Sequence, residues 1–431
     1  MEQVTIEFLK DARNTIDELN NEGISNYIEK LVKTNDEWRF RCLNLNAAES
    51  VMSPMARKAL NSDLNTRTTN GEIGARHHMG GKYIDQIEAL AIELAKKLFR
   101  VEHVEHRPIT TSIANGIAIR VNTEVGDTIM ALEEPRGHPT CREKGYPGYR
   151  GLKIVDIPFN YNEWNIDIDK LVERIHEIKP KPKLMTLGTS VFLFPHPLRE
   201  IREIADEIGA KIMYDAAHVL GLIAGKAFQD PLKEGADFMT GTISKTLSGP
   251  LGGLIVHNDA ELDKRIRSAI YNHLAATGLS RSAAMAITFA EMLEFGEAFA
   301  RQIIRNAQKL AQKLDEVGFD VVGRKKGYTR SHTIVFDVKY LGGGDEVAKK
   351  LEDANIICSA YKLWSAEEPW YGIRLGVTEM TRYGMKEHEM NIIAEYIRRV
   401  VIDKEDPKKI AKNVSIFRRQ FKDVQYCFSF H

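Results

Sequence analysis

The sequence predicts an α/β fold, in which a large domain with a mostly parallel central sheet is followed by a smaller α+β domain. From about residue 85, helical segments alternate with short apolar runs, which is typical of parallel βαβ units covered by helices. After Leu262 the alternation ends, and a long helical stretch leads into a second, smaller group of strands. We therefore expect a helical arm at residues 1–40, a large domain at 41–295 and a small domain at 296–431.

The first two segments are predicted to be helical. In the arm, Ile6, Leu9 and Ile16 recur at helical spacing among polar and charged residues, so the arm cannot form a core alone. Residues 84–99 form an amphipathic helix. The apolar side chains expected on its buried face are those of Ile87, Leu90, Ala91, Leu94 and Leu98.

Six apolar runs are the predicted strands of the large domain. They cover residues 128–132, 153–157, 183–188, 211–215, 238–242 and 253–256. A helix at 198–208, ended by Gly209, lies between two of them. The elements expected after Leu262 are helices at 283–314 and 387–400 and strands at 319–322 and 332–338.

Composition excludes several classes of protein. The 431 residues contain 60 Lys and Arg and 60 Asp and Glu, so the basic excess of a nucleic-acid or acidic-membrane binder is missing. The four cysteines form no CxxC pair, and the histidines His103 and His106 lack a third ligand, so no metal site is predicted. The first residues carry no apolar signal segment, and no run approaches about 18 apolar residues. We expect a cytoplasmic enzyme that binds neither nucleic acid nor a membrane.

An acid and a lysine follow two of the predicted strands. Asp215 stands at the C-terminal end of a buried strand, where open α/β sheets place ligand-binding groups. Lys245 follows the strand 238–242 among glycines and hydroxyls, and a partly desolvated lysine can form a Schiff base. A buried carboxylate nearby suits a pyridinium nitrogen. Taken singly, a helix-capping Asp and a solvated Lys are the commoner interpretations.

A hydroxyl cluster adds a third element. Thr110, Thr111 and Ser112 open a helix of small residues, and such a helix N-terminus can hold a phosphate. Alone, this pattern more often marks an N-cap. A phosphate cradle, an aspartate and a lysine in this order resemble a pyridoxal 5'-phosphate enzyme of fold type I, the aspartate-aminotransferase-like class.

The resemblance narrows to the serine hydroxymethyltransferase family, in its archaeal type, and runs from about residue 40 to near the C-terminus. The motifs that carry it are LNAAESVMSP at 45–54, GAR at 74–76, GGKYIDQIE at 80–88, DAAHVLGLIAG at 215–225, KTLSGPLGG at 245–253 and GIRLGVTEMTR at 372–382. The resemblance implies a homodimer, or a tetramer of paired dimers, in which each active site is built from two subunits.

The resemblance also implies roles for single residues. Lys245 would hold pyridoxal phosphate as a Schiff base, Asp215 would pair with the pyridine nitrogen, and His218 would support the phenolic oxygen of the ring. His138 would stack on the face of the cofactor, and Arg374 would bind the substrate carboxylate. The remaining cofactor-binding residues implied are Thr110, Thr111, Ser112, Ser190 and Thr242, and the remaining substrate-binding residues are Glu49, Asn70 and His77.

The departures from the family pattern lie on the reaction side of the site. Thr68-Thr69-Asn70-Gly71 stands where the family has Tyr-Ala-Glu-Gly, and an asparagine side chain cannot act as an acid or base near neutral pH. His77 and His78 replace a pair of the Tyr-Tyr or Leu-Tyr kind, Ala48 replaces a serine, and Ser244 replaces a histidine. An imidazole, His78 in particular, could serve as the missing acid or base. The alternative is a polar loop that packs against the partner subunit.

These patterns predict an enzyme that acts at the α-carbon of an amino acid. The leading expectation is aldol-type cleavage or transfer on a serine-, glycine- or threonine-like substrate, with the use of tetrahydrofolate or another pterin in doubt because the family's carboxylate is replaced by Asn70. Transamination, racemisation or cyclisation of a specialised amino acid on the same scaffold is the alternative. A non-catalytic protein that only binds the cofactor is disfavoured, because it would need no substrate clamp such as Arg374.

Overall fold

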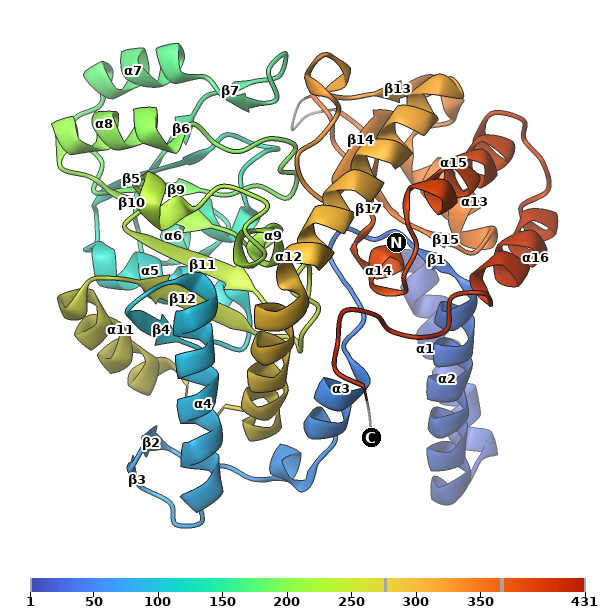
Figure 1. The fold of residues 1–431 in the computed structure, drawn as a ribbon, viewed down its shortest axis with the longest axis horizontal. Helices are drawn as coiled ribbons and strands as arrows, with labels where there is room; N and C mark the ends of the chain where they lie inside the picture. Colours follow the sequence, from blue (N-terminus) through green and yellow to red (C-terminus); the bar gives the residue numbers. More distant parts are fainter. Residues whose placement is uncertain (1, 275–276, 365–367, 430–431) are drawn as a thin grey trace.

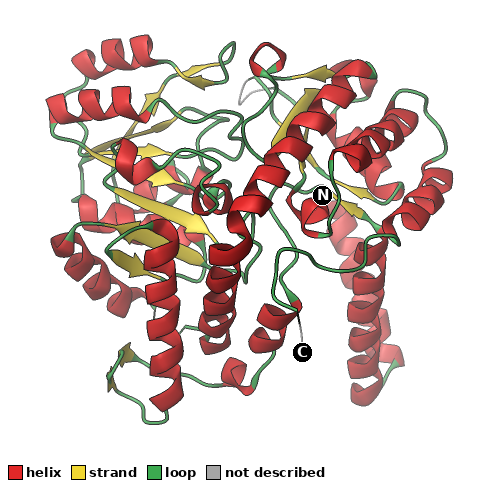
Figure 2. Cartoon of the chain, viewed as in Figure 1, coloured by secondary structure: helices red, strands yellow, loops and turns green. Residues whose placement is uncertain are grey.

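The computed structural model describes residues 2–274, 277–364 and 368–429. A large α/β part and a smaller part lie side by side, with the N-terminal helices beneath the smaller part (Figures 1 and 2). The central sheet of the large part has seven strands in the order β4-β12-β11-β10-β9-β5-β6. In chain order these are β4 (His103–Glu105), β5 (Thr128–Leu132), β6 (Lys153–Ile157), β9 (Leu184–Leu187), β10 (Lys211–Asp215), β11 (Phe238–Thr242) and β12 (Gly253–His257).

Neighbouring strands of this sheet are parallel except at one edge. The pairs β5–β6, β5–β9, β9–β10 and β10–β11 are parallel, which confirms the predicted mostly parallel sheet. The run at 253–256 is a strand, but β12 is antiparallel to both β11 and β4. The reason is its connection: β12 follows β11 through a loop, whereas a parallel partner needs a crossover, which is usually helical.

The sheet is buried on both faces because successive side chains point to opposite sides. Met213 of β10 faces the core cluster that contains residues of α5 (Thr111–Asn122) and α11 (Ala260–His273). Ile212 and Tyr214 face the other cluster, which includes residues of α8 (Leu198–Ile208) and α12 (Leu279–Glu316). The remaining helices of this part are α4 (Lys82–Phe99), α6 (Tyr146–Tyr149), α7 (Ile168–Glu177), α9 (Leu220–Ala224) and α10 (Pro231–Glu234).

The smaller part is built on a four-stranded antiparallel sheet in the order β13-β14-β17-β16. Its strands are β13 (Asp320–Val321), β14 (Thr333–Asp337), β16 (Ser359–Tyr361) and β17 (Gly372–Gly376). The helices of this region are α13 (Gly344–Asp353), α14 (Thr378–Arg382), α15 (Glu387–Val401) and α16 (Pro407–Arg418). The predicted long helix is α12, which runs from one part to the other (Figure 1), and the domain boundary at 295/296 stays a prediction.

The buried face of α4 differs from the predicted one. The side chains of Ile84, Ala91 and Leu98 are buried, whereas Leu90 is 59% exposed. Glu88 occupies the same buried face, where it forms an ion pair with Arg76. A charged residue can lie there because it is paired, and hydrophobic spacing alone does not reveal such a pair.

The predicted arm consists of α1 (Glu2–Glu18) and α2 (Asn21–Arg41), and α2 has no buried residue. It leads into β1 (Leu43–Asn44), which pairs with β15 (Ile356–Ile357). The remaining short elements are α3 (Pro54–Leu60), the hairpin β2 (Gly71–Glu72) and β3 (Ala75–Arg76), and the pair β7 (Phe159–Asn160) and β8 (Asn165–Ile166). Among the described residues, no helix is long and apolar enough to cross a membrane.

Candidate active site

Asp215 lies at the carboxyl end of β10 with both carboxylate oxygens held. Asn115 of α5 donates a hydrogen bond of 2.8 Å to Oδ2, and the backbone N–H of Ala217 donates one of 2.9 Å to Oδ1. The side chain is almost fully buried. A Cβ on Gly188, which follows β9, would lie 2.5 Å from the Cβ of Asp215, so only glycine leaves room for the aspartate. The carboxylate is therefore fixed by both neighbouring strands and α5.

Lys245 follows β11 and reaches the same place. Its Nζ lies 3.0 Å from Nε2 of His218, which lies in the turn after β10. Burial lowers the pKa of Lys245 to about 8, an effect opposed by the charge of Asp215 and reinforced by that of Arg374. Burial also lowers the pKa of His218, and the Lys245 charge adds to that effect. An amine with this pKa is far more often neutral at physiological pH than an ordinary lysine.

The imidazole of His218 is stacked on a second histidine. The rings of His218 and His332 are 6.0 Å apart and inclined by 19°. Nε2 of His332 lies 3.0 Å from the carbonyl oxygen of Ala47, and burial lowers the pKa of His332 to about 3. The Nδ1 atom of His218 is buried without a hydrogen-bond partner. His218 therefore presents neutral imidazole at the site, with one ring nitrogen unsatisfied.

The predicted phosphate cradle is the N-terminus of α5. Thr110 caps the helix, since its hydroxyl accepts a 3.3 Å hydrogen bond from the backbone N–H of Ile113. The hydroxyl of Thr111 is hydrogen-bonded to that of Thr242, the last residue of β11. The first backbone N–H groups of a helix have no acceptor within the helix and carry partial positive charge. The site thus combines a positive helix end with hydroxyls beside the Lys245 loop.

His138 is connected to Asp215 through a short chain of polar groups. Its Nδ1 lies 2.7 Å from the hydroxyl of Thr140, to which Asn115 donates a 3.3 Å hydrogen bond. Gly137, before it, is required by space, because a Cβ there would lie 2.1 Å from the carbonyl oxygen of Leu132. The loop after β5 therefore approaches the strand closely, and it orients the imidazole toward the same polar network.

Arg374 reaches the site from β17 of the smaller part. It donates hydrogen bonds of 3.1 Å to the carbonyl oxygen of Ser190 and 3.3 Å to the hydroxyl of Ser359. No carboxylate of the described chain forms an ion pair with it, and its Nε is buried without a partner. Burial lowers its pKa, although the guanidinium remains charged at neutral pH. It is a cation with hydrogen-bonding capacity to spare.

These groups fit pyridoxal phosphate. The cofactor needs an amine that can lose its proton, an acid for its ring nitrogen, and donors for an anion. Lys245, Asp215 and the N-terminus of α5 could supply these three, and the unsatisfied Nδ1 of His218 would leave a polar group for the ring. Within the described part of the chain, no group of three or more His, Cys, Asp or Glu side chains could hold a metal ion.

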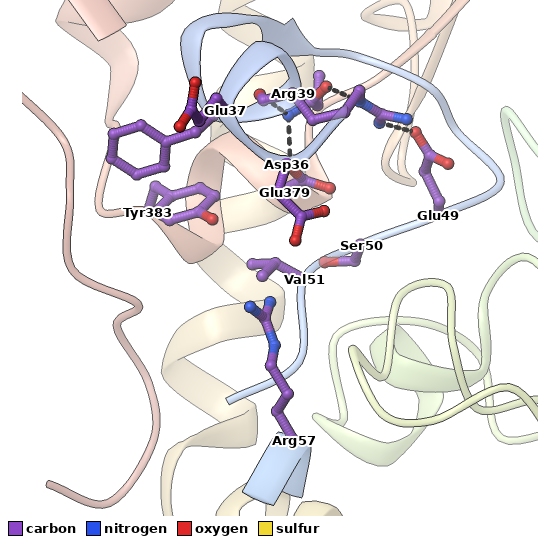
Figure 3. Close-up of a pocket in the computed structure, with 11 residues that line it drawn as sticks. Asp36, Glu37, Arg39, Glu49, Ser50, Val51, Arg57, Glu379 and Tyr383 are labelled. Carbon is purple, nitrogen blue, oxygen red and sulfur yellow. Dashed lines mark hydrogen bonds and ion pairs between the residues drawn. The ribbon is translucent and has the colours of Figure 1, made fainter. Parts of the chain in front are cut away.

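Glu49, one of the predicted substrate-binding residues, lies on the wall of a different cavity (Figure 3). Its carboxylate forms an ion pair with Arg39, whose Nε donates a 2.8 Å hydrogen bond to Asn44. Asn44 in turn donates one of 2.7 Å to Glu379, and burial raises the pKa of Glu379 to about 7. Ser50 connects this wall to the lysine loop, because its hydroxyl lies 2.8 Å from that of Ser248.

Asn70, His77 and His78 lie in a different place from Lys245 within this chain. Asn70 precedes the β2–β3 hairpin, and its side-chain oxygen accepts a 2.7 Å hydrogen bond from Gly71. The histidines follow the hairpin, both are exposed, and the ring of His77 lies 6.0 Å from that of Tyr271. Figure 1 shows the hairpin at the lower end of α4, away from α9 and the end of β11. The hairpin is therefore on the periphery of the single chain.

Two residues of the network, Asn115 and His332, are missing from the site predicted from the sequence. Asn115 connects Asp215, Thr140 and Thr240, whose hydroxyl donates a 2.6 Å hydrogen bond to it. Its signal was available, because Asn115 stands one helical turn after Thr111 and so shares its face. His332 is the first residue of the predicted strand 332–338, and only the packing of the two parts brings it to His218.

Comparisons with known proteins agree on the family. The serine hydroxymethyltransferase family matches residues 22–397. The serine hydroxymethyltransferase of Methanocella arvoryzae is 43% identical over 415 residues, which are 95% of this chain and 97% of the relative. That of Pyrococcus furiosus is 42% identical over 419 residues, which are 94% of this chain and 96% of the relative.

Among solved structures, the chain is similar to L-threonine transaldolase from Pseudomonas fluorescens in its internal aldimine state. The TM-score is 0.86 at 26% sequence identity, over 99% of this chain and 96% of that chain. The fold is therefore fold type I of the pyridoxal-phosphate enzymes, and the chain is a hydroxymethyltransferase- or aldolase-like enzyme of that class. This protein belongs to the serine hydroxymethyltransferase family.

Proposed function

We propose that this enzyme uses pyridoxal phosphate held by Lys245 to break or form the Cα–Cβ bond of a β-hydroxy amino acid of the serine or threonine kind. The observation that carries the proposal is the position of the Lys245 amine, 3.0 Å from His218 Nε2 and within the fields of Asp215 and Arg374. A lysine with a pKa of about 8 is suited to condensing with an aldehyde.

Asp215 is the group that would hold a proton on the ring nitrogen of the cofactor. When bound, pyridoxal phosphate supplies an electron sink for the pair of electrons released at the α-carbon. Because Asn115 and the Ala217 N–H each donate a hydrogen bond to one carboxylate oxygen, the aspartate is fixed in direction. Hydroxyls of Thr111, Ser112 and Thr242 and the N–H groups of α5 would bind the phosphate.

Arg374 would bind the α-carboxylate of the substrate. Its present partners, the Ser190 carbonyl and the Ser359 hydroxyl, are neutral, so among the described residues the cation has no counter-charge to lose when an anion arrives. Two guanidinium N–H groups can hold a carboxylate in one orientation, which would fix the other bonds of Cα relative to the cofactor plane. His138, held through Thr140, would cover the cofactor face, and Ser190 would lie beside the ring.

A homodimer with shared active sites would complete the substrate side. The hairpin that carries His77 and His78 is exposed in the single chain, which suits a segment that enters a partner's site. There the imidazole of His78 would be the acid or base that Asn70 cannot be, and His77 and Asn70 would contact the substrate. Glu49, which the Ser50–Ser248 contact connects to the lysine loop, would orient the substrate side from within the same chain.

A second candidate is a reaction other than aldol cleavage on the same scaffold, such as transamination, racemisation or cyclisation. It is favoured by Asn70, whose side-chain oxygen accepts a local hydrogen bond from Gly71 and whose amide cannot act as an acid or base near neutral pH. Tetrahydrofolate, or another pterin, would then have no role.

The experiment that tests the proposal is a panel of amino acids given to the cofactor-loaded protein with and without tetrahydrofolate. Aldol cleavage predicts release of an aldehyde and formation of glycine from serine or threonine analogues. Folate-dependent exchange of the hydroxymethyl group would identify an orthodox hydroxymethyltransferase. Keto-acid formation or loss of optical activity, without any aldehyde, would replace the proposal with the second candidate.

A further inference from the structure

Arg136 is a buried cation at the junction of the two parts of the molecule. It stands in the loop after β5, two residues before His138, and its side chain is 0% exposed. Its Nη2 donates a hydrogen bond to the carbonyl oxygen of Lys362, directly after β16 of the smaller part. Its Nε and Nη1 are buried without hydrogen-bond partners, and no carboxylate among the described residues pairs with it. An uncompensated buried charge is expensive, so its retention needs a reason.

Aromatic rings take the place of a counter-ion. The guanidinium carbon of Arg136 lies 4.8 Å from the ring centre of Trp164 and 4.9 Å from that of Tyr361. The rings of Tyr161 and Phe159 follow at 5.8 and 6.0 Å. The negative face of an aromatic ring attracts a cation, most strongly where water is excluded. Trp164, Tyr161 and Phe159 belong to the β7–β8 region of the large part, whereas Tyr361 belongs to β16.

Tyr361 contacts a second guanidinium, that of Arg374. The distance from the guanidinium carbon of Arg374 to the centre of the Tyr361 ring is 5.5 Å. In the β16–β17 pair, Ser359 is opposite Arg374 and Tyr361 is opposite Gly372, so Tyr361 and Arg374 are diagonal neighbours on one face of the sheet. The ring is 7% exposed, and its hydroxyl has no hydrogen-bond partner. One aromatic ring therefore connects Arg136 to Arg374.

A ligand-binding role for Arg136 itself is disfavoured by this geometry. The side chain has no exposed surface and is enclosed by four rings, so a substrate group has no space beside it. Its contacts lead instead to Tyr361 and, through that ring, to Arg374.

We propose that Arg136 is a positioning residue, which holds the Tyr361 ring against Arg374 and so fixes the guanidinium that receives the substrate carboxylate. The inference deepens the proposed function and rests on it. Without the cation, the ring loses its attraction to the loop after β5, and Arg374 keeps only two hydrogen bonds to neutral oxygens. The substrate carboxylate would then meet a guanidinium that must first be ordered, which lowers affinity.

The test compares glycine with glycinamide as ligands of the cofactor-loaded protein. Both carry the amine that meets the cofactor, but only glycine carries the carboxylate. Dissociation constants follow from titrating the visible absorption of the bound cofactor. We expect Arg136→Met to raise the dissociation constant of glycine about 10-fold and that of glycinamide less than about 2-fold, since only the carboxylate contact depends on Arg374. Arg136→Lys, which retains a cation for the rings, should recover most of the loss.

Arg418→Met is the matched control. Arg418 is also 0% exposed, and its guanidinium carbon lies 3.8 Å from the ring centre of Tyr383, but this pair joins the end of α16 to the end of α14 and does not contact Arg374. The Arg418→Met substitution should lower the melting temperature and leave both dissociation constants unchanged. If Arg136→Met raised both dissociation constants equally, or raised neither, the inference would be overturned.

A second pair of variants decides the matter if Arg136→Met does not fold. Tyr361→Phe keeps the ring and should bind glycine in preference to glycinamide as the wild type does. In Tyr361→Leu this preference, the ratio of the two dissociation constants, should fall about 10-fold. Equal ratios in the two variants would overturn the inference.

Wild-type protein that binds no cofactor, or that binds glycine and glycinamide equally, would contradict the proposed function. If the wild type prefers glycine and both Arg136→Met and Tyr361→Leu keep that preference, only the positioning role of Arg136 would be contradicted.

Discussion

The amine of Lys245 lies 3.0 Å from Nε2 of His218, and burial lowers the pKa of both groups. The two side chains follow neighbouring parallel strands, β10 and β11, whose carboxyl ends meet at one edge of the sheet. Each cation would repel the other, so the two groups are not protonated together, and burial makes the charge on Lys245 unfavourable. The arrangement stores an unfavourable lysine charge at the place where the proposed chemistry needs an amine.

The first prediction concerns stability without cofactor. Below pH 8, Lys245 is protonated in both the folded and the unfolded chain, and the folded state bears the full penalty. Between pH 8 and 10.5 the folded chain loses its proton first, so the free energy of unfolding rises with pH relative to a chain without this lysine. Lys245→Met should therefore be more stable than wild type at pH 7, by up to about 3 kcal/mol.

Urea unfolding of both apoproteins at pH 7 and pH 10 measures this difference, which should shrink at the higher pH. Lys264→Met, at an exposed lysine of α11, is the control and should change little at either pH. A Lys245→Met protein that is less stable than wild type at pH 7 would contradict the lowered pKa.

The second prediction concerns Asn115. Asn115→Ala removes the 2.8 Å hydrogen bond to Asp215 and the contact with Thr240, which leaves a buried carboxylate with one partner fewer. We expect turnover to fall by about 10-fold or more while the cofactor remains bound. Asn122→Ala, on the same helix but bonded only to the Ala118 carbonyl, is the matched control. The steady-state rates of the two cofactor-loaded variants test this prediction, and equal rates would contradict a role for Asn115 in the site.

The third prediction concerns the space beside Asp215. Gly188→Ala would place a Cβ 2.5 Å from that of Asp215, so a strand or the aspartate must move. We expect a loss of about 2 kcal/mol in the free energy of unfolding, together with weaker cofactor binding. Gly278→Ala, whose Cβ would meet its nearest neighbour at 3.8 Å, should be tolerated. Thermal melting and cofactor titration measure both effects, and a fully stable Gly188→Ala protein with normal affinity would refute the crowding.

The fourth prediction concerns the exposed hairpin. His78→Phe should abolish turnover but leave the cofactor bound, because in the proposed dimer His78 acts in the partner's site. Mixing His78→Phe with Lys245→Ala subunits should restore one working site per mixed dimer, to about a quarter of wild-type activity when the subunits exchange freely. His176→Phe, on α7, is a control that should be silent. Unchanged turnover in His78→Phe would end the acid–base hypothesis, and failure of mixing to restore activity would argue against shared sites.

Much of the fold could be predicted because its signals are local. The apolar runs at 128–132 and 211–215 are strands, and the amphipathic segment ended by Gly209 is α8 with Gly209 in the left-handed conformation. The direction of β12 depends on its pairing with β4 and β11, which no single segment encodes. For the same reason the predicted buried face of α4 is wrong at Leu90, since the Arg76–Glu88 ion pair determines which side chains of this helix are buried.

The site divides in the same way. Asp215 and Lys245 could be found because one ends a recognisable strand and the other follows one, whereas His218 was predicted through the family resemblance. Arg136 could not, because its burial depends on rings from residues 159–164 and 361, which come together only when the two parts of the molecule pack. All the roles predicted for single site residues stay predictions, and those of Glu49, Asn70, His77 and His78 depend in addition on the substrate and on the partner subunit.

The most direct test of the account is to locate the cofactor on the chain. The protein loaded with pyridoxal phosphate is reduced with borohydride, digested, and its peptides are analysed by mass spectrometry. The phosphopyridoxyl group should be found on Lys245, and Lys245→Ala should remain unlabelled. A label on another lysine, or no label on a protein that is otherwise folded, would contradict it.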